Sequence, residues 1–271
     1  MYNNLWIAAG ALALCLQTQY LLIGAIVLTP WTLFVFFATL LLYALHRLVG
    51  LRLTTDTPRY QAFIKYRKSL IISAIVGIIG SLLFFLQLNP PLQIMVLPVA
   101  FLSLGYALPI LPGGRRLRDL PYLKVVLVAG CWAVVTVVLP AMEYHILYNI
   151  PMWLMALERM LYIFAFAIAF DIRDVAVDRQ NEVRTLPGCL GIKVSKSLSY
   201  SFLCFNFFII ILNYQLDAYA WQQVLALALS TLFCAILIYF TTTARHDYYF
   251  IGLLDGLLLY PLFLLWLCSF L

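Results

Sequence analysis

The stretch Phe170-Asp171-Ile172-Arg173-Asp174-Val175-Ala176-Val177-Asp178 stands at the end of a long apolar run. Its three aspartates are spaced i, i+3 and i+7, so on an α-helix they fall within about 60° of one another around the axis. Carboxylates this close repel one another, and such a cluster is typical of a site that holds a cation. Aspartate oxygens suit a hard ion such as Mg²⁺, which is often shared with substrate phosphates. Asp171, Asp174 and Asp178 are therefore the predicted metal ligands; a solvated acidic helix end is the alternative.

The composition indicates that this stretch belongs to a membrane protein. Of the 271 residues, 65% are hydrophobic and 10% are charged, and the mean hydropathy is +1.00. A water-soluble domain carries roughly 25% charged residues. The apolar residues form blocks long enough to cross a bilayer, and these must be helices because lipid offers the backbone no hydrogen-bonding partner. We predict an all-α, polytopic membrane protein with a single domain over 1–271.

Nine apolar blocks predict about nine transmembrane helices. Their ranges are 5–28, 31–48, 69–88, 92–111, 122–142, 152–170, 198–214, 221–240 and 248–271. Prolines stand at several block edges, where a helix can begin without a backbone donor. We expect no cleavable signal peptide, because the first residues carry no Lys or Arg and the first block is long enough to span. The six cysteines form no CxxC pair and predict neither a metal site nor a disulfide.

The basic residues predict the orientation in the membrane. All Lys and Arg residues except Arg159 lie in or beside the connections after the second, fourth, sixth and eighth blocks. The positive-inside rule places these connections in the cytoplasm. We expect a multi-pass protein of the cell (inner) membrane, with a cytoplasmic N-terminus, a C-terminus on the outer side and a site open to the cytoplasm. The net charge of +6 reflects this bias, so membrane lipid is an expected partner and nucleic acid is not.

The segment from Asp171 to Gly191 carries a family resemblance. Its DxxDxxxD pattern, followed by Arg184-Thr185-Leu186-Pro187, resembles the second aspartate-rich motif of the UbiA-type intramembrane prenyltransferase superfamily. The resemblance implies nine helices around a central cavity, with two aspartate-rich motifs that bind the Mg²⁺–diphosphate of an isoprenoid donor at its cytoplasmic mouth. The basic segment that the family carries after its fourth helix is similar to residues 106–116. The resemblance implies a Mg²⁺ cofactor and diphosphate contacts from Tyr106, Arg115, Arg116 and Lys193.

The end of the second block departs from the family pattern. Where the first aspartate-rich motif, NDxxDxxxD, is expected, the chain reads Tyr43-Ala44-Leu45-His46-Arg47-Leu48-Val49-Gly50. Tyr43 takes the place of the leading Asn, His46 that of the first spaced Asp and Gly50 that of the second. The next carboxylate is Asp56. The carboxylate ligands for one Mg²⁺ are therefore missing from this stretch.

Two interpretations of this departure stay open. In one, His46 and Arg47 neutralise the diphosphate directly, since Arg binds phosphate bidentately, and a single metal at the aspartates completes the site. The protein is then a Mg²⁺-dependent membrane prenyltransferase that ionises an isoprenyl diphosphate and transfers the prenyl group to a lipophilic or aromatic acceptor. In the other, it is an inactive relative that binds an isoprenoid lipid or scaffolds a pathway.

Charged residues within the apolar blocks raise a third alternative. Asp255 lies inside the ninth block, and Glu158 and Arg159 lie inside the sixth. Charges in lipid are costly and commonly face a cavity or a partner. They allow a small-solute transporter as an alternative, although no repeat or pair of broken helices supports it. In the prenyltransferase interpretation Asp255 is a candidate intramembrane acid or base, and Glu158 and Arg159 have structural roles.

Overall fold

A computed structural model of the chain describes residues 4–53, 64–180 and 183–271. These residues are helical, with no strand in the described part of the chain, which confirms the all-α prediction. The helices are α1 (Leu5–Ile23), α2 (Pro30–Leu53), α4 (Arg67–Phe85), α5 (Pro90–Ala107), α6 (Leu123–Ala133), α7 (Leu139–Glu143), α8 (Ile150–Gln180), α9 (Leu186–Leu190), α10 (Ile192–Gln215), α11 (Trp221–Phe240) and α12 (Tyr260–Cys268). Asp56, the first carboxylate after α2, lies outside the described residues.

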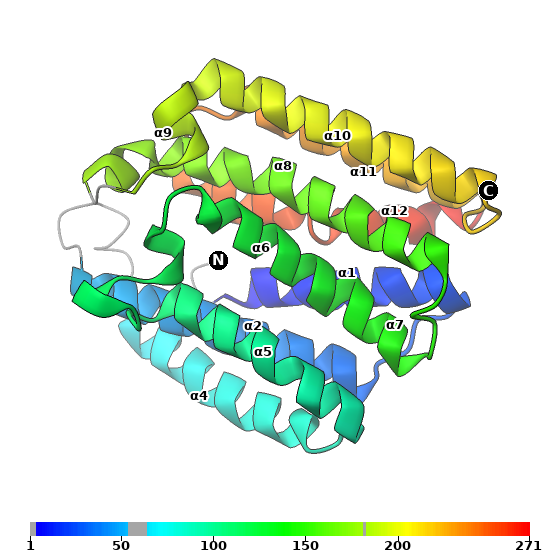
Figure 1. Ribbon diagram of the computed structural model, residues 1–271, viewed down its shortest axis with the longest axis horizontal. Coiled ribbons are helices and arrows are strands. Elements are labelled where there is room, and N and C mark those ends of the chain that lie inside the picture. The colour runs from blue at the N-terminus through cyan, green and yellow to red at the C-terminus, as the bar shows by residue number, and fades with distance from the viewer. Residues whose placement is uncertain (1–3, 54–63, 181–182) are drawn as a thin grey trace.

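The long helices run side by side in one bundle (Figure 1). Helix α4 lies at one edge beside α2 and α5, and α10 lies at the opposite edge. Helix α8 runs between them and is buried along much of its length, through residues such as Ile163, Ile168 and Ile172. The connection that follows α5 and the short helix α9 both lie at the left end of the bundle in Figure 1. This arrangement brings loops that are distant in sequence to one end of the molecule.

The membrane character of the bundle is evident on α4. Its outward face carries Ile72, Ile75 and Ile79, each of which is more than half exposed. Its inward face is glycine-rich: a Cβ on Gly77 would lie 2.8 Å from the backbone nitrogen of Leu41 on α2. Small residues let two backbones approach closely where lipid gives helices no hydrophobic reason to associate. An exposed apolar face and a tightly packed inner face are what a lipid-embedded helix requires.

Seven helical segments in the described residues are long and apolar enough to cross a membrane. They include Leu5–Ile23, Arg67–Phe85 and Trp221–Phe240. Helix α8 and the C-terminal segment are not among them; in the C-terminal segment the α-helix α12 covers only Tyr260–Cys268. The protein is a multi-pass membrane protein, whereas the predicted count of nine spans is not confirmed and stays a prediction.

Several helix ends differ from the predicted ranges for local reasons. Helix α1 ends at Ile23, because Gly24 adopts a left-handed conformation (φ 68°) and donates its N–H to the Tyr20 carbonyl. Helix α5 ends at Ala107, two residues before Pro109, because a residue that precedes proline is disfavoured in the helical region. The predicted block 152–170 is longer in the structure and continues through the aspartates to Gln180.

Two helices contain π-helical turns. The segment η3 (Val134–Val138) joins α6 to α7, and η4 (Tyr249–Leu254) precedes α12. A π-turn widens the helix by one residue and occurs frequently beside functional sites. The predicted block 248–271 is consequently divided, with Pro261 near the start of α12.

Candidate functional site

A cavity of about 950 Å³ opens within the bundle and receives residues from α2, α5, α6, α8 and the segment after η4. Its lining joins charged side chains to apolar ones such as Leu102, Trp132 and Phe166. Nearly all of the predicted site residues line this one cavity: His46, Arg47, Tyr106, Arg115, Arg116, Asp171, Asp174, Asp178 and Asp255. The structure therefore brings together residues that are more than 200 positions apart in the sequence.

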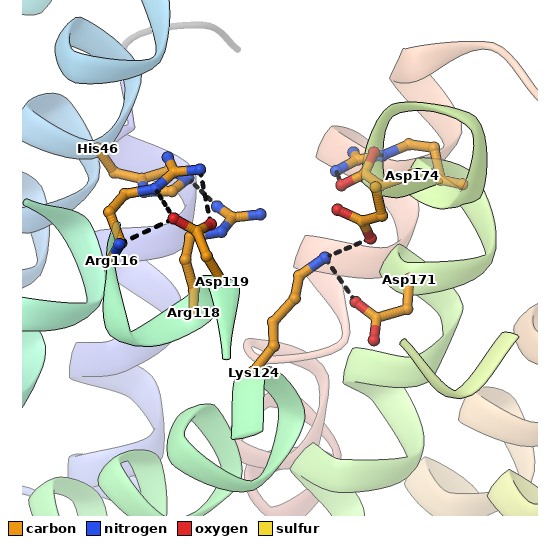
Figure 2. Close-up of polar contacts among 9 residues, drawn as sticks. His46, Arg116, Arg118, Asp119, Lys124, Asp171 and Asp174 are labelled. Carbon is orange, nitrogen blue, oxygen red and sulfur yellow. Dashed lines mark hydrogen bonds and ion pairs between the residues drawn. The ribbon is translucent and has the colours of Figure 1, made fainter. Parts of the chain in front are cut away.

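One side of the cavity, the acidic wall, is formed by Asp171, Asp174 and Asp178 on α8 together with Lys124 on α6. The Lys124 ammonium lies 2.8 Å from Asp171 Oδ1 and 3.0 Å from Asp178 Oδ2. All three of these side chains are more than nine-tenths buried. One ammonium group thus bridges two carboxylates that are two helical turns apart, as Figure 2 shows for Lys124 and Asp171.

Asp174, the middle aspartate, has a different partner. Arg173 donates from Nε to Asp174 Oδ1 (2.8 Å) and from Nη2 to Asp174 Oδ2 (3.0 Å). The same guanidinium lies 5.0 Å from the ring centroids of both Phe170 and Phe250. The two rings hold Arg173 through cation–π contacts, so both oxygens of Asp174 are engaged in a fixed bidentate pair.

The opposite side of the cavity, the basic wall, is formed by His46 on α2, Tyr106 on α5 and the segment 115–119. Within it, Arg116 and Asp119 are joined by three hydrogen bonds: Arg116 N and Nε to Asp119 Oδ2 (2.8 and 3.1 Å) and Arg116 Nη2 to Asp119 Oδ1 (2.9 Å). This pair closes the single 3₁₀ turn η2 (Leu117–Asp119). The turn presents Arg118 to the cavity.

Arg118 makes its described contacts with uncharged groups. Its Nη1 lies 2.6 Å from His46 Nε2, and its guanidinium carbon lies 5.6 Å from the Tyr106 ring centroid. Guanidinium has no acceptor, so His46 must accept at Nε2 and carry its ring proton on Nδ1. Figure 2 shows the basic and acidic walls on opposite sides, with the Arg118 guanidinium at the edge of its group that faces Lys124.

The electrostatics of the basic wall favour its charged forms. Burial by itself lowers the pKa of Arg118, but Tyr106 and the carboxylates Asp174 and Asp178 outweigh it and raise that pKa. Partial burial opposes the ionised form of Asp119, yet the hydrogen bonds from Arg116 hold the pKa of the Asp119 carboxyl below its usual value. Arg118 therefore stays a cation that is attracted toward the acidic wall.

The acidic wall offers hard oxygen ligands that fit a divalent cation. Asp171 Oδ2 is buried and has no hydrogen-bond partner within the described residues, so it is an unused hard ligand. No set of three or more His, Cys, Asp or Glu side chains in the described ranges is arranged to hold a metal ion by itself. A cation at this wall would be held by Asp171 and Asp178 with water and phosphate in the remaining positions, which is a common way to bind Mg²⁺. The set of three aspartate ligands stays a prediction.

Lys193 is the one predicted site residue that does not line the cavity. It is exposed near the start of α10. Its neighbour Ile192 packs against a buried cluster that includes Ile168 and Ile172. Successive helical residues point about 100° apart, so packing Ile192 inward turns Lys193 away from the cavity.

Sequence reasoning gave Lys124 and Arg118 too small a role. Neither residue is among those that the sequence predicts for the site, although a Lys within an apolar block is costly and signals a buried partner. The position of Arg118 depends on the backbone before it, where Gly113 and Gly114 both have positive φ (76° and 72°). These glycines reverse the chain, and no pattern in the sequence shows where the next side chains point.

A second group of polar side chains, the inner cluster, lies deep in the bundle and consists of Glu158, Arg159, Asn206, Tyr219 and Thr136. Tyr219 donates its hydroxyl to Glu158 Oε2 (2.9 Å), and Asn206 Nδ2 donates to the Glu158 carbonyl (2.9 Å). Arg159 Nη1 donates to Thr136 Oγ1 (3.1 Å). The void beside the cluster is about 10 Å³, which is close to the smallest space that holds one water molecule. The void leaves no room beside the cluster for anything larger than a water molecule, and the structural role of Glu158 and Arg159 stays a prediction.

The apolar bundle and its charged cavity mouth define the class of the protein: a multi-pass integral membrane protein with a charged cavity inside its helical bundle. Comparison then gives the family. The model of the UbiA prenyltransferase family matches residues 54–254, and the chain belongs to that family. No curated protein matches the sequence.

Solved structures show the same fold. A UbiA homologue from Aeropyrum pernix K1 has a TM-score of 0.68 at 14% identity, over 99% of this chain and 96% of that chain. A UbiA homologue from Archaeoglobus fulgidus, in a structure with GPP and Mg²⁺, has a TM-score of 0.59 at 13% identity, over 97% of this chain and 99% of that chain. A structure of digeranylgeranylglyceryl phosphate synthase has a TM-score of 0.58 at 15% identity, over 96% and 92%.

Proposed function

We propose that this protein is a Mg²⁺-dependent membrane prenyltransferase that ionises an isoprenyl diphosphate and transfers the prenyl group to a lipophilic or aromatic acceptor. The observation that carries the proposal is a single cavity whose lining joins an acidic wall, a basic wall and an apolar interior. An isoprenyl diphosphate has the matching parts, an anionic head and an apolar tail. The homologue from Archaeoglobus fulgidus has structures with GPP and with DMAPP, each with Mg²⁺.

The residues of the acidic wall have different roles in binding the diphosphate. Mg²⁺, when bound at Asp171 and Asp178, would neutralise the developing charge of the leaving diphosphate. Lys124 now bridges these two carboxylates at 2.8 and 3.0 Å, and its flexible ammonium can turn to a phosphate oxygen instead. Arg173 keeps Asp174 oriented and charged. These groups stabilise charge where it appears as the allylic C–O bond breaks.

The apolar part of the cavity suits the prenyl group. Phe166, Phe170 and Trp132 line it, and their ring faces stabilise an allylic cation by cation–π attraction while they exclude water. Asp255 also lines the cavity and is only 6% exposed. We propose it as the group that accepts the proton lost when the acceptor is alkylated. The mouth would face the cytoplasm, since the connection that holds Arg115, Arg116 and Arg118 is rich in basic residues.

Binding of an isoprenoid lipid without turnover is the second candidate. It is favoured by the ion pairs of the acidic wall, in which each of the three aspartates already has a cationic partner within the protein. It is favoured also by α2, where the described positions 43–50 contain no carboxylate. The two candidates differ in one measurable event, the release of diphosphate.

The test is Mg²⁺-dependent diphosphate release from purified protein in detergent, with allylic diphosphates of several chain lengths. Asp171→Asn removes the buried charge of the proposed ligand, and we expect release to fall by about 10²–10³-fold. Asp217→Asn is the matched control. Asp217 is exposed in the turn after α10 and does not line the cavity, and Asn tolerates its positive φ of 55°.

The outcomes separate the candidates. Release that needs Mg²⁺ and is lost only in Asp171→Asn supports the prenyltransferase. Mg²⁺-dependent donor binding with no release for any chain length favours the lipid-binding relative. Absence of both binding and release rejects the diphosphate site altogether.

A further inference from the structure

The cations of the cavity mouth differ in whether they have an ion-pair partner. On the acidic wall, Lys124 and Arg173 are paired with carboxylates. On the basic wall, Arg116 is paired with Asp119. Arg118 lies between these pairs and, among the residues that the structure describes, makes no ion pair. Its charge is therefore not compensated by a direct contact, although its side chain lines the cavity.

Arg118 is held in place by neutral groups. His46 accepts from Nη1 at 2.6 Å, and the guanidinium lies over the Tyr106 ring at 5.6 Å. The Arg116–Asp119 pair fixes the short turn that carries it. Such supports orient a guanidinium without neutralising it. A guanidinium with several N–H donors and no ion-pair partner is suited to bidentate binding of a phosphoryl group.

The spacing on α2 shows what this arrangement replaces. Tyr43, His46 and Gly50 have the same i, i+3, i+7 spacing as the aspartates of α8, and all three line the cavity. They offer no carboxylate to a metal ion on this side. His46 Nε2 instead accepts a hydrogen bond from Arg118. The cation held on this side of the cavity is therefore the Arg118 guanidinium and not a metal ion bound by carboxylates.

We propose that Arg118 binds the diphosphate of the donor directly, so that the chain uses one divalent ion, at the acidic wall, and a resident guanidinium on the opposite side. This inference rests on the proposed function and makes the basic wall an anion site that works without metal. Inorganic pyrophosphate, which carries the same phosphoryl groups without the prenyl tail, is the probe. It should bind to the wild-type protein in the presence of EDTA.

The first experiment is calorimetric titration of pyrophosphate into the protein in nanodiscs, with EDTA and then with Mg²⁺. We expect metal-free binding to weaken by at least about tenfold in Arg118→Ala, because a charge-assisted contact is lost. Arg118→Lys keeps the charge without the fork and should recover only part of the affinity. Arg67→Ala, at an exposed position on α4 outside the cavity, should bind within about twofold of wild type.

The second experiment needs no variant. The number of Mn²⁺ ions bound per protein at saturating pyrophosphate, counted by electron paramagnetic resonance, should be one. Two ions, or pyrophosphate binding that requires metal and is unchanged in Arg118→Ala, would overturn the role of Arg118 while the prenyltransferase proposal stands. No pyrophosphate binding even with Mg²⁺ would overturn both.

Discussion

The acidic wall and the inner cluster are two groups of buried charges on the same helix, and they differ in their surroundings. Asp171 and Glu158 both lie on α8, and both are less than 5% exposed. The carboxylate of Asp171 contacts the Lys124 ammonium and borders a cavity of about 950 Å³. That of Glu158 meets a tyrosine hydroxyl and borders a void of about 10 Å³. The burial of a carboxylate alone thus does not distinguish a binding site from a structural contact. The partner of the carboxylate and the volume of the cavity beside it do.

This difference leads to a general expectation for the two sites. A charge that borders an open cavity can exchange its internal partner for an external ion. A charge in a closed network cannot, because no ligand reaches it. Mg²⁺ should therefore restore the stability that is lost when the internal cation of the acidic wall is removed. It should not restore the stability that is lost when the internal cation of the inner cluster is removed.

The largest effect is expected for Arg159→Met in the inner cluster. This change removes the hydrogen bonds that Arg159 donates to Thr136 and to the Leu14 carbonyl and takes a positive charge from beside the buried Glu158; leaving a buried charge uncompensated costs about 3–5 kcal/mol. The free energy of unfolding, measured by denaturant titration in detergent micelles, should fall by that amount with and without Mg²⁺. Arg67→Met is the exposed control. Restoration by Mg²⁺ would erase the distinction between the sites.

Lys124→Met makes the same kind of change at the acidic wall. We expect a loss of about 2–3 kcal/mol in EDTA, less than in the inner cluster because water reaches the cavity. Saturating Mg²⁺ should restore most of this loss, since an ion that binds only the folded protein stabilises it. Mg²⁺ should also bind more tightly than to wild type, where it competes with the ammonium.

The Lys124 measurement is a comparison of unfolding curves in EDTA and in Mg²⁺, with Lys68→Met as the exposed control on α4. Equal stability of Lys124→Met in the two buffers would show that the acidic wall does not accept the ion.

Tyr219→Phe is a smaller change in the inner cluster. It removes one hydrogen bond to Glu158 Oε2 (2.9 Å) and should cost about 1–2 kcal/mol of unfolding free energy. Pyrophosphate affinity should not change, because Tyr219 does not line the cavity. Tyr214→Phe, at an exposed position on α10, should leave both quantities unchanged. A change in pyrophosphate binding in Tyr219→Phe would indicate that the two sites are coupled.

The smallest effect is expected for Asp119→Asn in the basic wall. The pKa of Asp119 is lowered in the folded protein by Arg116, so the pair stabilises the protein above the unfolded pKa and loses this effect as pH falls through the folded pKa. Both side chains of the pair are partly exposed, so water screens their attraction and the contribution is below about 1 kcal/mol. Unfolding at pH 7 should show this small difference from wild type, and unfolding below the folded pKa should show none. A difference that persists at acid pH would contradict the assignment.

The sequence predicted the fold class and the family because both depend on patterns along single helices. Apolar blocks predicted a multi-pass helical protein, and the spacing of Asp171, Asp174 and Asp178 placed them on one helix, which α8 confirms. What the sequence could not predict is which charges meet. Arg173 and Lys124 divide the aspartates between them, and this division depends on how α6 packs against α8.

The basic wall was the harder part for the same reason. His46 was predicted to face the diphosphate, and in the structure it lines the cavity and accepts from Arg118. That contact joins α2 to a turn after α5, so it depends on a chain reversal at two glycines rather than on helical spacing. Loop geometry of this kind is set by tertiary contacts and leaves no periodic signal.

The ammonium of Lys124 also bears on how the protein is made. A helix with three aspartates is costly to place among lipids, and a ribosome delivers α6 to the membrane before α8. The lysine is thus already present when the acidic helix arrives, and Arg173 comes with that helix. The nascent chain brings the counter-charges for its own buried carboxylates, so its assembly in the bilayer need not wait for a divalent ion or a ligand.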